Sequence, residues 1–263
     1  MSTQSTSELP MTNSSRPDLS LPTLTDDDLA SIGAPDGSPR RAGLVGEIGT
    51  ALQPWRLAFK SRALRSAPKG NGRIAIALPG WKAPEVTTAP LRGYLRSIGH
   101  DAQGWGFGIN QGDVEAKRDD MVVKVRALAE RSGRPVNLLG WSLGGVVARE
   151  VARTAPESVH RLVIYGSPVV GGPTHTAGVG TYAVDEVTRI RELQAHLDLT
   201  EPVTTPITAI FTRNDSVVDW RACIDRFSLD VTTVEVGSTH VGLGIDPDVW
   251  LTIAEALAEH DDV

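Results

Sequence analysis

The stretch VNLLGWSLGGVVA, residues 136–148, is the part of the chain that decides its fold. An apolar run short enough for a buried strand leads into Gly-x-Ser-x-Gly, formed by Gly140, Ser142 and Gly144, and a helical pattern follows at once. So sharp a turn strains the backbone of its central residue, and the flanking glycines remove Cβ atoms that would collide with the neighbouring strand and helix. We therefore expect Ser142 to stand exposed at the carboxyl end of a strand, facing the N–H groups of a helix that begins near Leu143.

The sequence around this turn decides whether the pentapeptide is more than a glycine-rich turn with an incidental serine. In a chain with 26 glycines, chance alone produces such a pentapeptide in roughly a tenth of sequences. From Arg73 onwards, however, apolar runs alternate with stretches whose apolar residues follow helical spacing, which predicts a parallel sheet with helices on both faces. Besides the strand before Ser142, we expect strands at about residues 74–78, 101–105, 162–165, 207–211 and 231–236.

Between about Arg73 and His260 the chain resembles the α/β-hydrolase superfamily, whose nucleophile elbow has the form found at residues 140–144. The resemblance implies an α/β fold with a mostly parallel sheet of about six strands, helices on both faces and a small cap. Similar hydrolases place their cap before the last two strands, so residues 169–205 are the candidate lid. An ordinary crossover helix with a long loop is the alternative interpretation of this insert.

A serine hydroxyl is a poor nucleophile at neutral pH, so it needs a neighbouring base and a carboxylate that orients this base. Of the six histidines, His240 directly follows the last predicted strand, where the resemblance places the base. His175, in the loop of the insert, is the alternative. The other histidines lie at strand starts, in the insert's helix or in the tail: His100, His160, His196 and His260.

The order Ser, then Asp or Glu, then His that the resemblance implies confines the acid to residues between Ser142 and His240. Asp215 comes just after a predicted strand, in a loop that can return toward His240. This segment looks like the acid loop of lipase-like members. Asp219 and Asp185 are the alternatives, and Asp215 is also expected to form an Asx-type turn.

A second tight turn, Leu78-Pro79-Gly80-Trp81, follows the first predicted strand. Related hydrolases carry a His-Gly or Pro-Gly turn here, and the next backbone N–H joins the N–H after the nucleophile in holding the tetrahedral oxyanion. Carried over to this chain, the two donors are the backbones of Trp81 and Leu143. The indole rings of Trp81 and Trp141 are then expected to flank the cleft and to favour a substrate with an apolar acyl or aromatic group.

Together these residues imply a serine hydrolase that cleaves carboxylic esters through an acyl-enzyme, similar to carboxylesterases and lipases. Such chemistry requires no metal and no organic cofactor. An acyltransferase is one alternative, because it uses the same residues but delivers the acyl group to an alcohol or amine instead of water. A non-catalytic binding member of the fold is the alternative from another class, and such members usually lack a triad residue.

Composition narrows the class of partners. A net charge of −6, from 26 basic and 32 acidic residues, does not indicate the basic surface that binds nucleic acid. The single cysteine, Cys223, is expected to be a small buried hydrophobe rather than a metal ligand or half of a redox pair. No apolar run approaches the roughly 18 residues that span a bilayer, and the N-terminal stretch lacks the residue order of a secretory signal. We therefore expect a soluble, cytoplasmic protein.

The first seventy residues are expected to differ from the hydrolase domain at 71–263. Residues 1–40 are rich in Ser, Thr and Pro and have no aromatic residue, which predicts disorder. Residues 41–70 are expected to be helical and amphipathic, with an apolar stripe on one face and basic residues on the other faces. The stripe consists of Ile48, Leu52, Trp55 and Phe59. We expect it to dock on the domain, and contact of residues 44–65 with an anionic membrane surface is the alternative.

Overall fold

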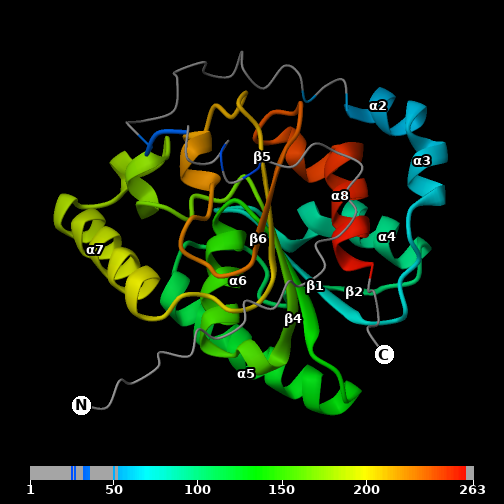
Figure 1. Ribbon diagram of the computed structural model, residues 1–263, viewed down its shortest axis with the longest axis horizontal. Helices are drawn as coiled ribbons and strands as arrows, with labels where there is room; N and C mark the ends of the chain where they lie inside the picture. The colour runs from blue at the N-terminus through cyan, green and yellow to red at the C-terminus, as the bar shows by residue number, and fades with distance from the viewer. Residues whose placement is uncertain (1–24, 26, 28–31, 36–49, 51–52, 259–263) are drawn as a thin grey trace, which may run out of the picture.

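A six-stranded, entirely parallel sheet forms the centre of the computed structural model, which describes residues 25, 27, 32–35, 50 and 53–258 (Figure 1). The strands lie side by side in the order β2-β1-β3-β4-β5-β6. Their bounds are β1 Ile74–Leu78, β2 Asp101–Gly104, β3 Val136–Trp141, β4 Val159–Tyr165, β5 Ile207–Phe211 and β6 Val231–Glu235. The prediction of a mostly parallel sheet of about six strands is confirmed.

Helices cover both faces of this sheet (Figure 1). Helices α4 and α8 pack on one face, and α5 and α6 pack on the other, which gives two separate apolar cores. The four helices are α4 Ala89–Ser97, α5 Val114–Ser132, α6 Leu143–Thr154 and α8 Pro247–Leu257. A strand that is buried on both faces has no polar side, so β1 reads as the uninterrupted apolar run Ile74–Leu78.

The strand order reverses beside β1, and this reversal positions the site. From β1 the chain first goes outward to β2, and it then crosses back so that β3 lies on the other side of β1. Open parallel sheets bind ligands outside the carboxyl ends of their strands at such a point. Leu78, the last residue of β1, lies in register with Gly140 near the end of β3. The turn after β1 and the turn after β3 are therefore neighbours at one edge of the sheet.

The insert at residues 169–205 is held against the loop that follows β5. Its first part contains two short 3-10 helices, η4 (Gly172–His175) and η5 (Val179–Thr181). The Ala177 N–H donates to the Val217 carbonyl at 2.7 Å, and an isolated antiparallel bridge joins the neighbouring residues, Thr176 and Val218. The role of this segment as a lid stays a prediction.

The second part of the insert is helix α7 (Val184–Thr200), which lies at the left margin of Figure 1, on the far side from α8. None of the apolar residues that follow helical spacing along it is fully buried, and Leu193 is 40% exposed; these residues are Val187, Ile190, Leu193 and Leu197. The buried residue of α7 is instead Asp198, whose Oδ1 accepts hydrogen bonds from Arg149 and Arg153 of α6, both at 2.7 Å. An ion network, rather than a fully buried apolar face, therefore anchors this helix on α6.

The segment before the domain does not dock as expected. It forms helices α2 (Gln53–Phe59) and α3 (Ser61–Ser66), which pack beside α8. Trp55 and Phe59 are 69% and 85% exposed. The prediction that these two side chains dock on the domain was therefore wrong. The other two residues of the expected stripe lie outside the described residues, as does most of the segment 1–40 for which the sequence predicts disorder.

Polar contacts explain why α2 turns its aromatic side chains outward. The amide of Gln53, which is buried, donates to Asp246 at 2.9 Å. Arg56 forms ion pairs with the same carboxylate and with Asp248, at the beginning of α8. Because these bonds hold the polar face of α2 against α8, the face that carries Trp55 is left in solvent.

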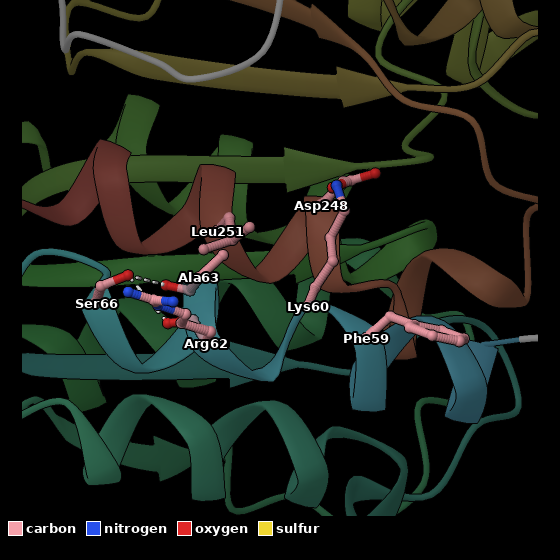
Figure 2. A pocket seen from close by; sticks show the side chains of 7 residues that line it. All are labelled: Phe59, Lys60, Arg62, Ala63, Ser66, Asp248 and Leu251. Carbon is pink, nitrogen blue, oxygen red and sulfur yellow. Dashed lines mark hydrogen bonds and ion pairs between the residues drawn. The ribbon is translucent and has the colours of Figure 1, made fainter.

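A surface groove of about 590 Å³ lies where α3 meets α8. Figure 2 shows Lys60 reaching toward Asp248, with which it forms an ion pair, while Phe59 stands at one end of the groove. The lining residues are Phe59, Lys60, Arg62, Ala63, Ser66, Asp248 and Leu251. No residue of the predicted site lines this groove. Contact of residues 44–65 with a membrane surface stays a prediction, and none of the described helices has the length and apolar character needed to cross a bilayer.

Candidate active site

Ser142 occupies the tight turn between β3 and α6. Its φ of 53° is a conformation that non-glycine residues rarely adopt. Close packing explains the two flanking glycines. A Cβ on Gly140 would lie 2.3 Å from the Cα of Gly145, and a Cβ on Gly144 would lie 2.5 Å from the carbonyl oxygen of Leu78. The strained turn and its glycines agree with the geometry expected for a nucleophile elbow.

The imidazole of His240 lies between Ser142 and Asp215. Its Nε2 is 3.1 Å from the Oγ of Ser142, and its Nδ1 is 2.7 Å from the Oδ2 of Asp215. His240 and Asp215 are buried, at 4% and 8% exposure, while Ser142 is partly exposed. The three side chains singled out from the sequence therefore form one continuous chain of hydrogen bonds at the carboxyl edge of the sheet.

The loop that carries Asp215 orients its carboxylate. Oδ1 accepts hydrogen bonds from the backbone N–H groups of Val217 and Val218, at 2.8 and 2.7 Å, which is the expected Asx-type turn. Oδ2 is then directed at Nδ1 of His240. Because a carboxylate oxygen only accepts, the proton of a neutral imidazole belongs on Nδ1, and Nε2 is left to accept the hydroxyl proton of Ser142.

The alternative histidine and carboxylates make other contacts. His175 ends η4, and its carbonyl accepts a hydrogen bond from the Asp219 N–H at 2.9 Å. The side chain of Asp219 caps the short helix η6 (Trp220–Cys223) by accepting from the Arg221 N–H. Asp185 is exposed in the first turn of α7. In the described part of the chain, none of these three side chains takes part in the hydrogen bonds that link Ser142, His240 and Asp215.

The expected oxyanion donors are the backbone N–H groups of Leu143 and Trp81, and this role stays a prediction. Leu143 is the first residue of α6, so its N–H has no acceptor within the helix. Among the described residues, the Trp81 N–H donates no backbone hydrogen bond. The turn that carries it touches the elbow, because a Cβ on Gly80 would lie 3.3 Å from the Cβ of Ser142.

Trp141 contacts His240 directly, a role that the sequence did not indicate. Its indole N–H donates to the backbone carbonyl of His240 at 3.2 Å, and the two ring centroids are 5.9 Å apart. The bond spans 99 positions of the chain, and no local pattern reports such a partner. Trp141 is thus placed to support the imidazole, and its contact with a substrate stays a prediction.

Trp81 lies between two glycine-containing segments. A Cβ on Gly112 would be 3.0 Å from its indole Nε1, and a Cβ on Gly178, in the insert, would be 3.3 Å from its Cζ3. Both neighbours lack side chains, so the backbone closely approaches each side of the ring. The insert therefore reaches the turn that follows β1, and contact of Trp81 with a substrate stays a prediction.

Cys223 is buried, at 2% exposure, as expected. Burial, with a smaller contribution from the carboxylates of Asp215 and Asp219, raises the pKa of its thiol well above the ordinary value. A thiol kept protonated is a weak nucleophile. Within the described residues, no group of three or more His, Cys, Asp and Glu side chains is arranged to hold a metal ion. The expectation that the chemistry needs no metal and no cofactor stays a prediction.

Comparison with known proteins gives partial sequence matches and broader structural ones. No family model matches the chain. Over 103 residues it is 31% identical to the pimeloyl-[acyl-carrier protein] methyl ester esterase of Aliivibrio fischeri (strain MJ11), a match that covers 38% of each protein. The protein of the same name from Vibrio campbellii (strain ATCC BAA-1116) is 28% identical over 102 residues, or 37% of this chain and 38% of that protein. The match thus spans less than half the length of these curated relatives.

Three solved structures resemble most of the chain. Aspergillus fumigatus lipase B has a TM-score of 0.54 and 18% identity, with 75% of this chain and 57% of that chain covered. A structure from work on LipS and LipT, two metagenome-derived lipolytic enzymes, has a TM-score of 0.53 and 16% identity, with 72% and 93% covered. The type II thioesterase BorB from the borrelidin biosynthetic cluster has a TM-score of 0.50 and 19% identity, with 73% and 94% covered.

The strand order, the helices on both faces and these structural likenesses establish that the protein has the α/β-hydrolase fold. Structural similarity at sequence identities below 25% indicates the fold but not the substrate, and the evidence for the activity lies in the site itself.

Proposed function

We propose that the protein is a serine hydrolase that cleaves carboxylic esters, in the manner of carboxylesterases and lipases. One observation carries this proposal: the hydrogen bonds that run from Ser142 through His240 to Asp215, next to two available backbone N–H groups. Esterases and lipolytic enzymes among the similar proteins support the same reaction class.

The first half-reaction transfers the acyl group to the enzyme. The Oγ of Ser142 attacks the carbonyl carbon of the ester while Nε2 of His240 takes the hydroxyl proton. Asp215 stabilises the imidazolium that forms. The carbonyl oxygen becomes an oxyanion, which the N–H groups of Trp81 and Leu143 bind. Cleavage of the carbon–oxygen bond then releases the alcohol, which takes the proton from His240, and the acyl group stays on Ser142.

The second half-reaction uses water in the same arrangement. His240 removes a proton from the water as its oxygen attacks the acyl carbon, and the same two N–H groups bind the second oxyanion. Collapse of this intermediate releases the carboxylic acid and returns the proton to the Oγ of Ser142. The proposed cycle uses side chains and backbone groups of this chain and water, without a metal or an organic cofactor.

We further propose a small-molecule ester with an apolar acyl or aromatic group as the substrate, in a cytoplasmic setting and without nucleic acid as a partner. The partly exposed indole of Trp81 supports this class, because it belongs to the turn that touches Ser142. The relatives' own substrates, as named, include a methyl ester of a carrier-bound acyl group.

The test is a panel of nitrophenyl esters of graded acyl length. The wild type should release nitrophenol, and Ser142→Ala should be slower by roughly a thousandfold or more in kcat, since it has lost the nucleophile. Ser158→Ala is the control, because Ser158 is a serine that precedes β4 at the opposite edge of the sheet, away from the site. Equal rates for the wild type and Ser142→Ala on every ester would remove the assignment.

The same assay separates the alternatives. With an added acceptor alcohol, a hydrolase continues to form mainly the carboxylic acid, whereas an acyltransferase forms mainly the new ester and less acid. A non-catalytic member of the fold would release no nitrophenol, and a fluorophosphonate probe would leave Ser142 unlabelled. Mass spectrometry of the peptide that contains Ser142 reads the second result directly.

A further inference from the structure

Asn110 lies in the glycine-rich loop between β2 and α5 and is completely buried. It makes three hydrogen bonds to the turn that follows β1. Its side-chain Nδ2 donates to the carbonyl of Pro79 at 2.9 Å, its carbonyl accepts from the Lys82 N–H at 2.7 Å, and its N–H donates to the carbonyl of Ala83 at 3.2 Å. Its Oδ1 accepts a fourth bond, from the Gly112 N–H at 3.2 Å.

We propose that Asn110 is a positioning residue that holds the Trp81 peptide so that its N–H is directed to the oxyanion. This inference rests on the proposed function, because it concerns a donor of the proposed oxyanion site. Asn110 has no bond to Ser142 or His240 among those of the described residues, so it acts through the turn and not on the substrate.

The hydrogen bonds of Asn110 hold the peptide units on both sides of the unit that carries the Trp81 N–H. The Trp81 N–H belongs to the peptide between Gly80 and Trp81. The carbonyl of Pro79 belongs to the peptide before it, and the Lys82 N–H belongs to the peptide after it. Since a peptide unit is planar, anchoring the units on both sides to one buried residue restricts the orientation of the unit between them.

The chemistry of the two partners explains why an asparagine stands here. The Pro79 carbonyl can only accept a hydrogen bond, and the Gly112 N–H can only donate one, so the side chain between them has to donate and accept. A carboxylate of the same shape satisfies Gly112 but not Pro79, and an alkyl side chain satisfies neither. The Pro79 carbonyl lies in a buried residue and needs such a bond, because buried backbone groups are costly to leave unpaired.

The turn is strained, which makes the tethers necessary. Lys82 has a φ of 54°, a conformation that non-glycine residues rarely adopt. Gly112 has a φ of 104°, and a Cβ there would lie 3.0 Å from Nε1 of Trp81. The bond from Gly112 to Asn110 therefore keeps this backbone against the indole, while the bond from Lys82 keeps the strained residue in place.

The deciding experiment compares Asn110→Asp with the wild type on a nitrophenyl ester and on its thionoester, in which sulfur replaces the carbonyl oxygen. Sulfur accepts hydrogen bonds weakly, so the preference for the oxygen ester measures how well the oxyanion donors are placed. Loss of one such donor costs about 10²–10³ in kcat. For a displaced donor we expect kcat on the oxygen ester to fall about 10–100-fold, with KM nearly unchanged and a smaller loss on the thionoester.

The matched control is Asn137→Asp. Asn137 is also buried, and its side-chain nitrogen and oxygen have no hydrogen-bond partner among the described residues. It lies near the beginning of β3, away from the carboxyl edge. Its kcat per folded molecule and its preference between the two esters should stay at the wild-type values. Parallel losses of Asn110→Asp on both esters, or no loss at all, would overturn the proposal.

A second measurement keeps the inference independent of the substrate. Hydrogen exchange and ¹⁵N–¹H spectra of the full chain report on the backbone of Trp81 and Lys82 without any ester. In Asn110→Asp the Lys82 amide should exchange at least tenfold faster and the Trp81 amide signal should shift, while the amides of β5 stay unchanged. If the wild type hydrolyses no ester, the proposed function fails, and unchanged amides at Trp81 and Lys82 would separately overturn the role of Asn110.

Discussion

The two ends of helix α6 carry polar groups that differ in how fully their hydrogen bonds are satisfied. At the amino end, Ser142 is partly exposed, and the N–H of Leu143 has no acceptor within the helix. Nearer the carboxyl end, Arg149 is 1% exposed, and all three of its guanidinium nitrogens donate. The acceptors are Asp198, Asp225 and the hydroxyl of Ser228.

This difference in hydrogen bonding indicates what each end of α6 can do. Binding of a developing charge requires donors that the folded protein leaves open, whereas a buried charge is tolerated only when its donors and acceptors are all paired. Substitutions at the amino end of α6 should therefore change the rate and leave stability nearly intact. Substitutions in the Arg149 network should do the opposite.

Among the substitutions that test this comparison, Asp215→Asn is expected to have the largest effect, a loss of kcat. Two backbone N–H groups bind Oδ1, so the amide oxygen of asparagine should take that place and the NH2 group should face Nδ1 of His240. The imidazole proton would then sit on Nε2, which could no longer accept from Ser142. We expect kcat to fall roughly 10³–10⁴-fold, about 4–5 kcal/mol of barrier.

Steady-state kinetics on a nitrophenyl ester, together with urea unfolding, checks this expectation. Asp219→Asn is the matched control, because Asp219 is buried to a similar degree but caps η6 instead of binding His240. Stability of Asp215→Asn should stay close to that of the wild type. A kcat near the wild-type value would show that the amino end of α6 does not depend on this carboxylate.

The next effect concerns stability. Arg149→Met should destabilise the fold by about 3–5 kcal/mol, because Asp225 and Asp198 lose a buried cationic partner. Urea unfolding measures the loss, and kcat per folded molecule should be unchanged. Arg189→Met, which breaks an exposed ion pair to Glu115, is the control and should cost at most about 1 kcal/mol. Equal stability of the two variants would contradict the contrast between the ends of α6.

The pH dependence of stability provides a second measurement on the same variant. Burial by itself raises the pKa of Asp225, but Arg149 and the hydrogen bonds of Ser228 outweigh burial and hold this pKa below its ordinary value. A lowered pKa means that the stabilisation is present above the unfolded value of about 3.9 and is lost as the pH falls through the lower folded value. In Arg149→Met the main group that lowers the pKa of Asp225 is absent, so acidification should cost the variant less stability than it costs the wild type, and the stability difference between the two should shrink as the pH falls.

The smallest effect is expected from Trp141→Phe, which removes the hydrogen bond to the carbonyl of His240. A neutral hydrogen bond contributes about 0.5–1.5 kcal/mol, so kcat should fall by a few-fold as the imidazole becomes less well positioned. Trp250→Phe is the matched control, since that indole also donates to a backbone carbonyl, that of Gly244, at 3.2 Å. The control should lose similar stability with no change in kcat, and equal kcat losses in both variants would refute a specific role for Trp141.

Local patterns predicted the parts of this protein that depend on neighbours in the chain. The apolar runs, the elbow around Ser142 and the turn at Pro79 and Gly80 are each set by a few consecutive residues. His240 and Asp215 could be chosen because each comes soon after the end of a parallel strand, and the carboxyl ends of such strands meet at one edge. Their catalytic roles stay proposals.

Tertiary structure alone decided the contacts between distant segments. The bond from Trp141 to His240, the tethers from Asn110 to the turn after β1 and the Arg149 network each join residues far apart in the chain. The outward position of Trp55 has the same cause, because ion pairs to α8 determine which face of α2 is covered. The physical reason is that apolar periodicity reports whether a residue tends to be buried, whereas the partner of a polar group depends on which segments the fold brings within hydrogen-bonding distance.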